Sequence, residues 1–176
     1  MSSEKFNIGI DFGGVLSVHD SKLGAEHRNV SINMPLAVEN LLKLKALGHK
    51  LFLISFCGRS RAIETQKSLE ETTINDTMSC AEVFDEIIFV KSIEYKRYLC
   101  EYLNCHFMVD DREDILQHVT QSECKTIPIL FGAERHATFT AAADWNRVTE
   151  IISSTPHFST ELYFTRPDRM IHNVKP

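Results

Sequence analysis

Short apolar runs rich in β-branched and aromatic residues alternate with helix-periodic segments from residue 6 to about residue 153. Such alternation is typical of a parallel sheet, because each parallel strand is reached through a crossover that usually contains a helix. The sequence therefore predicts a three-layer, Rossmann-like α/β fold with a parallel sheet and helices on both faces. We expect strands at residues 6–11, 50–55, 86–90, 106–110 and 126–131.

Helices are expected between these strands, at residues 36–48, 60–71, about 94–103, 113–121 and 144–152. The third of them carries apolar and aromatic side chains at the i, i+3, i+4, i+7, i+8 spacing, which we interpret as a stripe that packs in the core: Tyr95, Tyr98, Leu99, Tyr102 and Leu103. The polar stretch at residues 71–80 is expected to be a loop. Asp144 stands at an N-cap position for the last helix.

A chain of 176 residues has room for one domain of ordinary size. We predict a single α/β domain at residues 1–153 without a large cap, followed by an extended tail at residues 154–176. This tail holds three of the five prolines and a single strand-like run, at residues 161–164. It is expected to lie on the body of the protein or on a partner.

Composition excludes several classes of protein. The net charge of -5 argues against non-specific nucleic-acid binding through a basic surface. No apolar run approaches the ~20 residues that a membrane helix needs, and no secretory signal is recognisable, so we expect a cytoplasmic protein with no membrane partner. Five cysteines without paired metal-ligand spacing are expected to be reduced thiols: Cys57, Cys80, Cys100, Cys105 and Cys124.

Polar residues end three of the predicted strands. Asp11 ends the first, Ser55 the second, and Asp110 and Asp111 the fourth, while Lys96 lies in the first turn of the helix before that fourth strand. Ligands of open parallel sheets bind beyond the carboxyl ends of the strands. Each residue alone would be an ordinary cap, turn or surface charge. Together, the clustered carboxylates would repel one another unless a cation or a lysine neutralises them.

In this order of residues the sequence resembles the haloacid dehalogenase-like superfamily, most of whose members are magnesium-dependent phosphohydrolases. The resemblance covers residues 6–153 and includes Asp11 after a hydrophobic strand, Ser55 at the end of the next, Lys96, and the acidic segment 110–114. Receiver domains use the same groups in another order, with their acidic pair on the first strand and their lysine last. The order here therefore argues against a receiver domain.

The resemblance implies that Asp11 is a nucleophile that forms an aspartyl-phosphate. It implies that Mg²⁺ is held by Asp11, the backbone carbonyl of Gly13 and Asp110, with either Asp111 or Asp114 in support. Magnesium prefers oxygen ligands of this kind.

The resemblance also implies a phosphate site made of Ser55 and backbone N–H groups near Phe12 and Phe56, with Lys96 neutralising both the nucleophile and the phosphate. Gly58 and Arg59 follow Ser55 directly, and Arg59 is a candidate for a second phosphate contact.

Gly13 departs from the pattern, because phosphatases of this superfamily usually carry a general acid two residues after the nucleophile. A general acid typically contributes ~10² to 10⁴ in rate. Its absence is compatible with a slow phosphatase in which His19 or Asp20 substitutes, and with an inactive protein that binds phosphate or nucleotides. Hydrolysis of a carbon–halogen bond by Asp11 is a third alternative, for which the acidic cluster would have no use.

The spacing of the motifs leaves no room for an inserted cap. About twenty residues separate Gly14 from Pro35, and the segment from Ser55 to Lys96 accommodates a helix, a loop and a strand. An open site suits a phosphorylated substrate that is either a small molecule or a macromolecule. It also allows a homo-oligomer in which a second subunit lends the lid, and the tail is the other candidate for that role.

Overall fold

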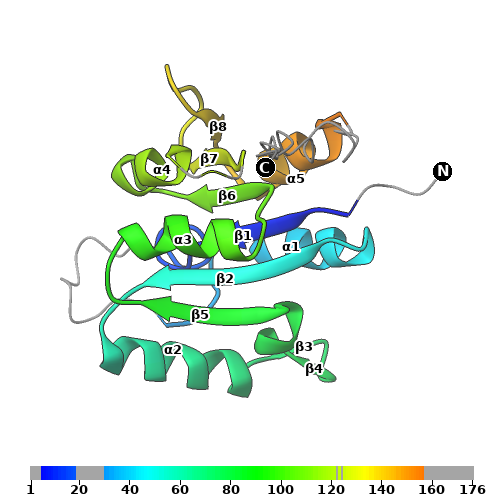
Figure 1. The fold of residues 1–176 in the computed structure, drawn as a ribbon. Helices are drawn as coiled ribbons and strands as arrows, with labels where there is room; N and C mark the ends of the chain where they lie inside the picture. The colour runs from blue at the N-terminus through cyan, green and yellow to red at the C-terminus, as the bar shows by residue number, and fades with distance from the viewer. Residues whose placement is uncertain (1–4, 19–29, 122, 124, 157–176) are drawn as a thin grey trace, which may run out of the picture.

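A parallel sheet forms the centre of the protein in the computed structural model, which describes residues 5–18, 30–121, 123 and 125–156. Its strands lie in the order β5-β2-β1-β6-β7-β8, so that β1 is a central strand between β2 and β6 (Figure 1). All five strand pairs are parallel. The strands are β1 (Asn7–Ile10), β2 (Lys50–Phe56), β5 (Glu86–Val90), β6 (Phe107–Asp110), β7 (Ile127–Phe131) and β8 (Thr140–Ala142).

Helices cover both faces of this sheet. The longer segments are α1 (Ala37–Ala46), α2 (Arg59–Glu71), α3 (Glu94–Tyr102), α4 (Glu113–Thr120) and α5 (Trp145–Ser154). One apolar cluster joins α1 and α5 to the sheet, and a second joins α3 and α4 to it. The expected three-layer α/β fold is thereby confirmed, and α2 lies beyond the β5 edge of the sheet (Figure 1).

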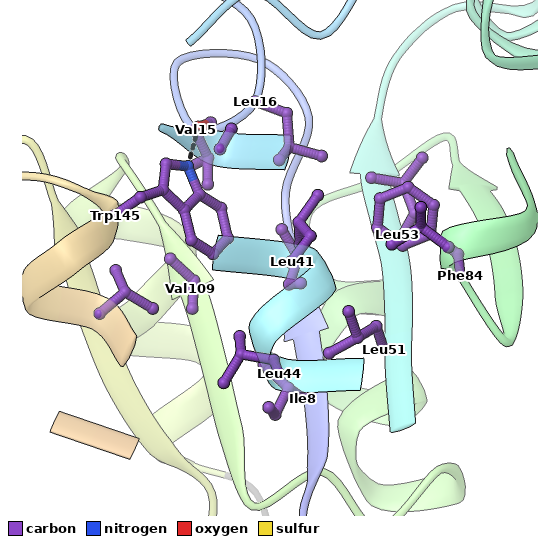
Figure 2. Packing of buried hydrophobic residues seen from close by; sticks show 14 of the residues in the cluster. Ile8, Val15, Leu16, Leu41, Leu44, Leu51, Leu53, Phe84, Val109 and Trp145 are labelled. Carbon is purple, nitrogen blue, oxygen red and sulfur yellow. Dashed lines mark hydrogen bonds between the residues drawn. The ribbon is translucent and has the colours of Figure 1, made fainter. Parts of the chain in front are cut away.

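The segment that follows β1 is fixed to the first apolar cluster. Val15 and Leu16 are fully buried beside Leu41 of α1 (Figure 2). The indole Nε1–H of the buried Trp145 donates a hydrogen bond of 2.8 Å to the carbonyl oxygen of Val15. This contact spans 130 positions of the sequence and holds the turn after Asp11 against α5.

The stripe predicted to be core on α3 is confirmed for its leucines, since Leu103 is buried and Leu99 packs against the same apolar cluster, and is wrong for its tyrosines. Tyr95, Tyr98 and Tyr102 on α3 are 55%, 52% and 80% exposed, whereas Lys96 and Cys100 of the same helix are buried. Helical spacing shows which residues share a face, but it does not show which of two faces turns inward. On α3 the inward face is the one that carries Lys96.

Two further differences concern local structure. The stretch predicted as a loop at residues 71–80 contains a small antiparallel hairpin, β3 (Thr73–Ile74) with β4 (Met78–Ser79), and leads into a short 3₁₀ helix, η2 (Cys80–Val83). The short strand β8 was missed, because Thr140–Ala142 carries small residues without a strong strand signal.

Almost all of the predicted tail lies outside the described residues, as does the run at residues 161–164. Among the helices that the structure describes, none combines the length and the apolar character that a membrane span requires.

Candidate active site

Three neighbouring strands bring the predicted site residues to one edge of the sheet. Asp11 directly follows β1, Ser55 lies near the end of β2, and Asp110 ends β6. Since β2, β1 and β6 are adjacent and parallel, their carboxyl ends meet. The backbone N–H of Asp11 donates to the carbonyl oxygen of Val109 at 2.9 Å, which extends the β1–β6 pairing to the residue where the chemistry is expected.

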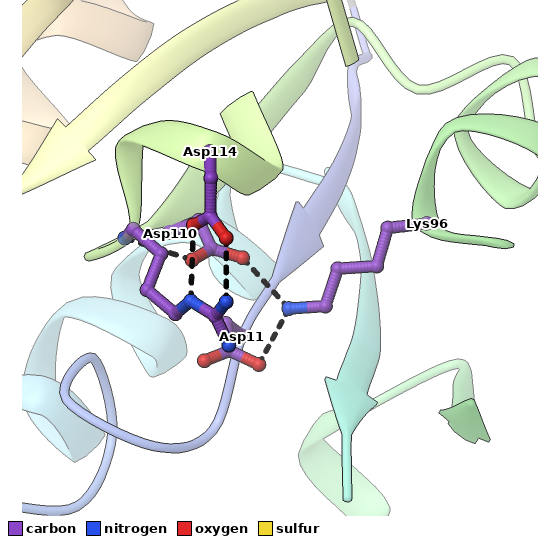
Figure 3. A network of polar contacts seen from close by, with 5 residues as sticks. Asp11, Lys96, Asp110 and Asp114 are labelled. Atoms are coloured by element: carbon purple, nitrogen blue, oxygen red, sulfur yellow. Dashed lines mark hydrogen bonds and ion pairs between the residues drawn. The ribbon is translucent and has the colours of Figure 1, made fainter. Parts of the chain in front are cut away.

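Lys96 bridges the two carboxylates that end β1 and β6. Its Nζ lies 2.7 Å from Asp11 Oδ1 and 2.7 Å from Asp110 Oδ2 (Figure 3). The side chain of Lys96 is fully buried, and the other oxygen of Asp110, Oδ1, accepts the backbone N–H of Arg112 at 3.0 Å. Lys96 therefore fixes the relative positions of Asp11 and Asp110.

One lysine does not fully neutralise this cluster, and the pKa values reflect that. The pKa of Asp110 is raised to about 7, chiefly by burial and then by the charge of Asp11, against the opposing effect of Lys96. Burial opposes the charge of Lys96, but the two carboxylates outweigh burial and raise the pKa of that lysine. The site thus keeps an excess of buried negative charge, which a divalent cation would relieve.

A third carboxylate completes a set that could hold such a cation. Oxygen atoms of Asp11, Asp110 and Asp111 lie within 4.8 Å of one another. Of the two alternatives for the supporting ligand, Asp111 is the one in this set. Asp114 instead pairs with Arg112, its Oδ1 accepting Nε at 3.0 Å and its Oδ2 accepting Nη2 at 2.6 Å.

Gly14 makes room for Asp111. Its φ of +78° is a conformation that side chains rarely adopt, and a Cβ at this position would lie 2.0 Å from Asp111 Oδ2. The backbone N–H of Gly14 donates to the carbonyl oxygen of Ser17 at 2.9 Å, which closes the turn after Asp11. The glycine at 14 therefore allows the carboxylate of Asp111 to approach the turn.

A cavity of about 460 Å³ opens above these carboxylates. Asp11, Phe12, Gly13, Ser55 and Phe56 line it, as predicted for the phosphate and metal site, and Gly58 and Asp111 do as well. Lys96 and Asp110 are not among its lining residues, because both are buried behind the surface of the cavity. Sequence reasoning missed the other lining residues: Cys57, Arg61, Thr65, Arg112 and Ile115.

The arginines of the site differ from the prediction. Arg59, proposed for a second phosphate contact, is exposed at the first residue of α2 and does not line the cavity. Arg61 lines the cavity instead. Because a helix turns by ~100° per residue, the side chains of Arg59 and Arg61 leave α2 in different directions. Arg112 lines the other side of the cavity and places its guanidinium carbon 5.9 Å from the centre of the Phe56 ring.

The two candidates for a substitute general acid, His19 and Asp20, lie outside the described residues. Gly13 itself lies at the cavity and forms a bridge with Ser17. Cys57 also lines the cavity, and burial raises the pKa of its thiol, so the thiol is neutral at ordinary pH.

Comparison with solved structures supplies the fold family. D,D-heptose 1,7-bisphosphate phosphatase from B. bronchiseptica, complexed with magnesium and phosphate, aligns with a TM-score of 0.61 over 84% of this chain and 97% of that one, at 12% identity. The enzyme of the same name from Burkholderia thailandensis gives a TM-score of 0.59 over 86% and 100%, also at 12% identity. The chain has the haloacid dehalogenase-like fold.

The core domain of a putative phosphoglycolate phosphatase from Streptococcus pneumoniae is also similar in structure, with a TM-score of 0.51 over 88% of this chain and all of that one, at 13% identity. No protein-family model matches the sequence, and no curated protein matches it. The resemblance drawn from the strand-end residues is thus confirmed at the level of the fold.

Proposed function

We propose that the protein is a magnesium-dependent phosphohydrolase that uses Asp11 as its nucleophile on a phosphate monoester. The observation that carries the proposal is the buried Lys96, which holds Asp11 and Asp110 at 2.7 Å each, with Asp111 close by. A structural ion pair needs one carboxylate for one lysine. Two carboxylates on one buried lysine, with a third carboxylate within 4.8 Å of them beside a cavity, suit a site that gains a cation and then a phosphate.

Mg²⁺ fits this donor set, because it consists of hard oxygen atoms: Asp11, the carbonyl of Gly13, Asp110 and Asp111. When bound, the ion would stabilise negative charge on the phosphoryl oxygens. Solved structures of similar fold include one complexed with magnesium and phosphate, although their identity to this chain is low.

The proposed reaction has two steps, both at Asp11. A carboxylate oxygen of Asp11 attacks the phosphorus, a bond forms between them, and the bond from phosphorus to the ester oxygen breaks with its electron pair leaving on that oxygen. Ser55 and the N–H groups beside Phe12 and Phe56 would hold the phosphoryl oxygens, and Lys96 would keep Asp11 oriented. Water then attacks the aspartyl-phosphate, releasing inorganic phosphate and regenerating Asp11.

The test is a panel of phosphate esters, small and macromolecular, assayed for phosphate release with and without Mg²⁺. Asp11→Asn keeps the size of the side chain and removes the attacking charge, so we expect release to fall to background. Asp144→Asn is a matched control, because it changes a helix-capping Asp away from the site. Turnover that survives in Asp11→Asn would refute Asp11 as the nucleophile.

A protein that binds phosphate or a nucleotide without turnover is the second candidate. Gly13 favours it, since this cavity-lining position carries no acid to protonate a leaving group. In that case Mg²⁺ and inorganic phosphate would bind together while every ester in the panel stayed intact. Carbon–halogen hydrolysis is the weaker alternative, because it would leave the acidic set without a role.

A further inference from the structure

Arg112 and Asp114 form a polar pair at the cavity that the proposed reaction does not use. Arg112 lines the cavity together with Asp11, and Asp114 lies on the first turn of α4; both side chains are exposed, at 44% and 53%. The guanidinium donates two hydrogen bonds to the Asp114 carboxylate, at 3.0 and 2.6 Å. This bidentate arrangement fixes the plane of the guanidinium as well as its position.

The pair reaches across the site. Arg112 follows β6, but its guanidinium carbon lies 5.9 Å from the centre of the Phe56 ring, which ends β2. Since β1 lies between β2 and β6 in the sheet, the contact spans the carboxyl end of β1, where Asp11 stands. The backbone of Arg112 is tied to the same cluster, because its N–H donates to Asp110 at 3.0 Å.

In-line attack by Asp11 determines on which side of the phosphorus the leaving group departs. When a carboxylate oxygen of Asp11 attacks phosphorus, the ester oxygen that departs lies on the opposite side of the phosphorus. Asp11, Phe56 and Arg112 line the same cavity, so an oxygen that departs into the cavity leaves on the side of the phosphorus where Arg112 is available. A cation held there would stabilise the charge that develops on that oxygen.

We propose that Arg112 is a catalytic residue that stabilises the leaving-group oxygen by charge and hydrogen bonding, with Asp114 as its positioning residue. The inference rests on the proposed phosphohydrolase function. Arg112 would compensate for the general acid that Gly13 does not provide. A guanidinium stays protonated throughout the reaction, so the leaving oxygen takes its proton from water after the bond breaks. Arg112 therefore replaces proton transfer by electrostatic stabilisation.

The test compares Arg112→Met with Arg147→Met, which removes an exposed arginine that pairs with Glu150 on α5, away from the site. With Mg²⁺ present, Arg112→Met should lower kcat for an alkyl phosphate by about 10²-fold, the usual effect of removing one donor to a developing charge. The effect on p-nitrophenyl phosphate should be much smaller, because that leaving group needs little stabilisation. Guanidinium ion added to Arg112→Met should restore part of the alkyl-phosphate activity.

Asp114→Asn keeps one acceptor for the guanidinium and should show the same preference for good leaving groups to a lesser degree. Equal losses on the two esters in Arg112→Met, or losses matched by Arg147→Met, would overturn the proposal. Equal losses would indicate that Arg112 only binds substrate or supports the fold.

A second measurement separates this inference from the proposed function. Orthovanadate with Mg²⁺ mimics the phosphoryl group with an oxygen on the side opposite the nucleophile, and its affinity can be measured by calorimetry without turnover. We expect Arg112→Met to weaken vanadate binding about 10-fold without weakening the binding of Mg²⁺ alone, because the variant removes a positive charge near Asp110 and Asp111. If the wild-type protein hydrolyses no ester, the phosphohydrolase proposal fails. Vanadate affinity that is equal in Arg112→Met and wild type overturns the role of Arg112 in either case.

Discussion

Replacing Asp110 by Asn is expected to stabilise the metal-free protein at pH 8 and to abolish its response to Mg²⁺. Asp110 has a pKa of about 7 in the folded protein, against an ordinary value of 3.8. At pH 8 the ionised carboxylate therefore costs folding about 4 kcal/mol, at about 1.4 kcal/mol per pKa unit. Asn removes that cost but cannot accept from both Lys96 and the Arg112 N–H, which costs about 1 kcal/mol. We expect a net gain of about 2 to 3 kcal/mol in the free energy of unfolding.

The direction of the pKa shift determines whether acidification stabilises or destabilises the protein. A carboxyl group whose pKa is raised on folding stabilises the folded state fully below its unfolded pKa, and this contribution is lost as the pH rises through the folded pKa. The wild-type protein without metal should therefore become more stable on acidification from about pH 8 to about pH 5, a window set by the shift of Asp110 from 3.8 to about 7. Asp110→Asn should lack this gain, and below the ordinary pKa of histidine it should lose stability on acidification, because burial lowers the pKa of His49 in the folded protein.

Urea unfolding followed by circular dichroism, with EDTA or with Mg²⁺, measures both effects. Asp114→Asn is the matched control, because the pKa of that exposed carboxyl is lowered by its hydrogen bonds with Arg112 and it stays ionised across the window. Mg²⁺ should stabilise the wild-type protein and the control at pH 8 but not Asp110→Asn. Wild-type and Asp110→Asn profiles that run parallel across the window, or equal stabilisation of the two by Mg²⁺, would refute the reasoning.

Two adjacent glycines give the remaining predictions. Gly14→Ala should lower the free energy of unfolding by about 1 to 2 kcal/mol or more and weaken Mg²⁺ binding, because φ at this position is +78° and the new Cβ would meet Asp111. Thermal melts measure the first effect and calorimetry the second. If neither quantity changes, the prediction is wrong. Gly13→Asp should raise turnover of an alkyl phosphate more than that of p-nitrophenyl phosphate if a missing acid limits the reaction. Steady-state kinetics test this, and equal changes on the two esters would count against it.

The position of the site was predictable because it depends on local features of the sequence. Asp11 directly follows an apolar strand, Ser55 lies near the end of one and Asp110 ends one, and parallel topology alone brings such strand ends together. The fourteen positions from Lys96 to Asp110 hold one helix and one short strand, which return the chain to the same edge of the sheet. Which of Asp111 and Asp114 lies beside Asp11 and Asp110 was not predictable, because it depends on which carboxylate pairs with Arg112.

The face that α3 turns inward could not be predicted, because the tyrosines and Lys96 lie on different sides of the helix, while Leu99 and Leu103 are compatible with either orientation. Full burial of a large side chain contributes about 1.5 to 3 kcal/mol, so the tyrosines Tyr95, Tyr98 and Tyr102 favour an inward stripe. That orientation would move Lys96 outward and leave Asp11 and Asp110 without their cation, at about 3 to 5 kcal/mol for each broken buried pair. Tyrosine tolerates exposure better than other aromatics because its hydroxyl is hydrated. The ion cluster therefore sets the rotation of α3, and the exposed tyrosines follow from the site rather than from the core.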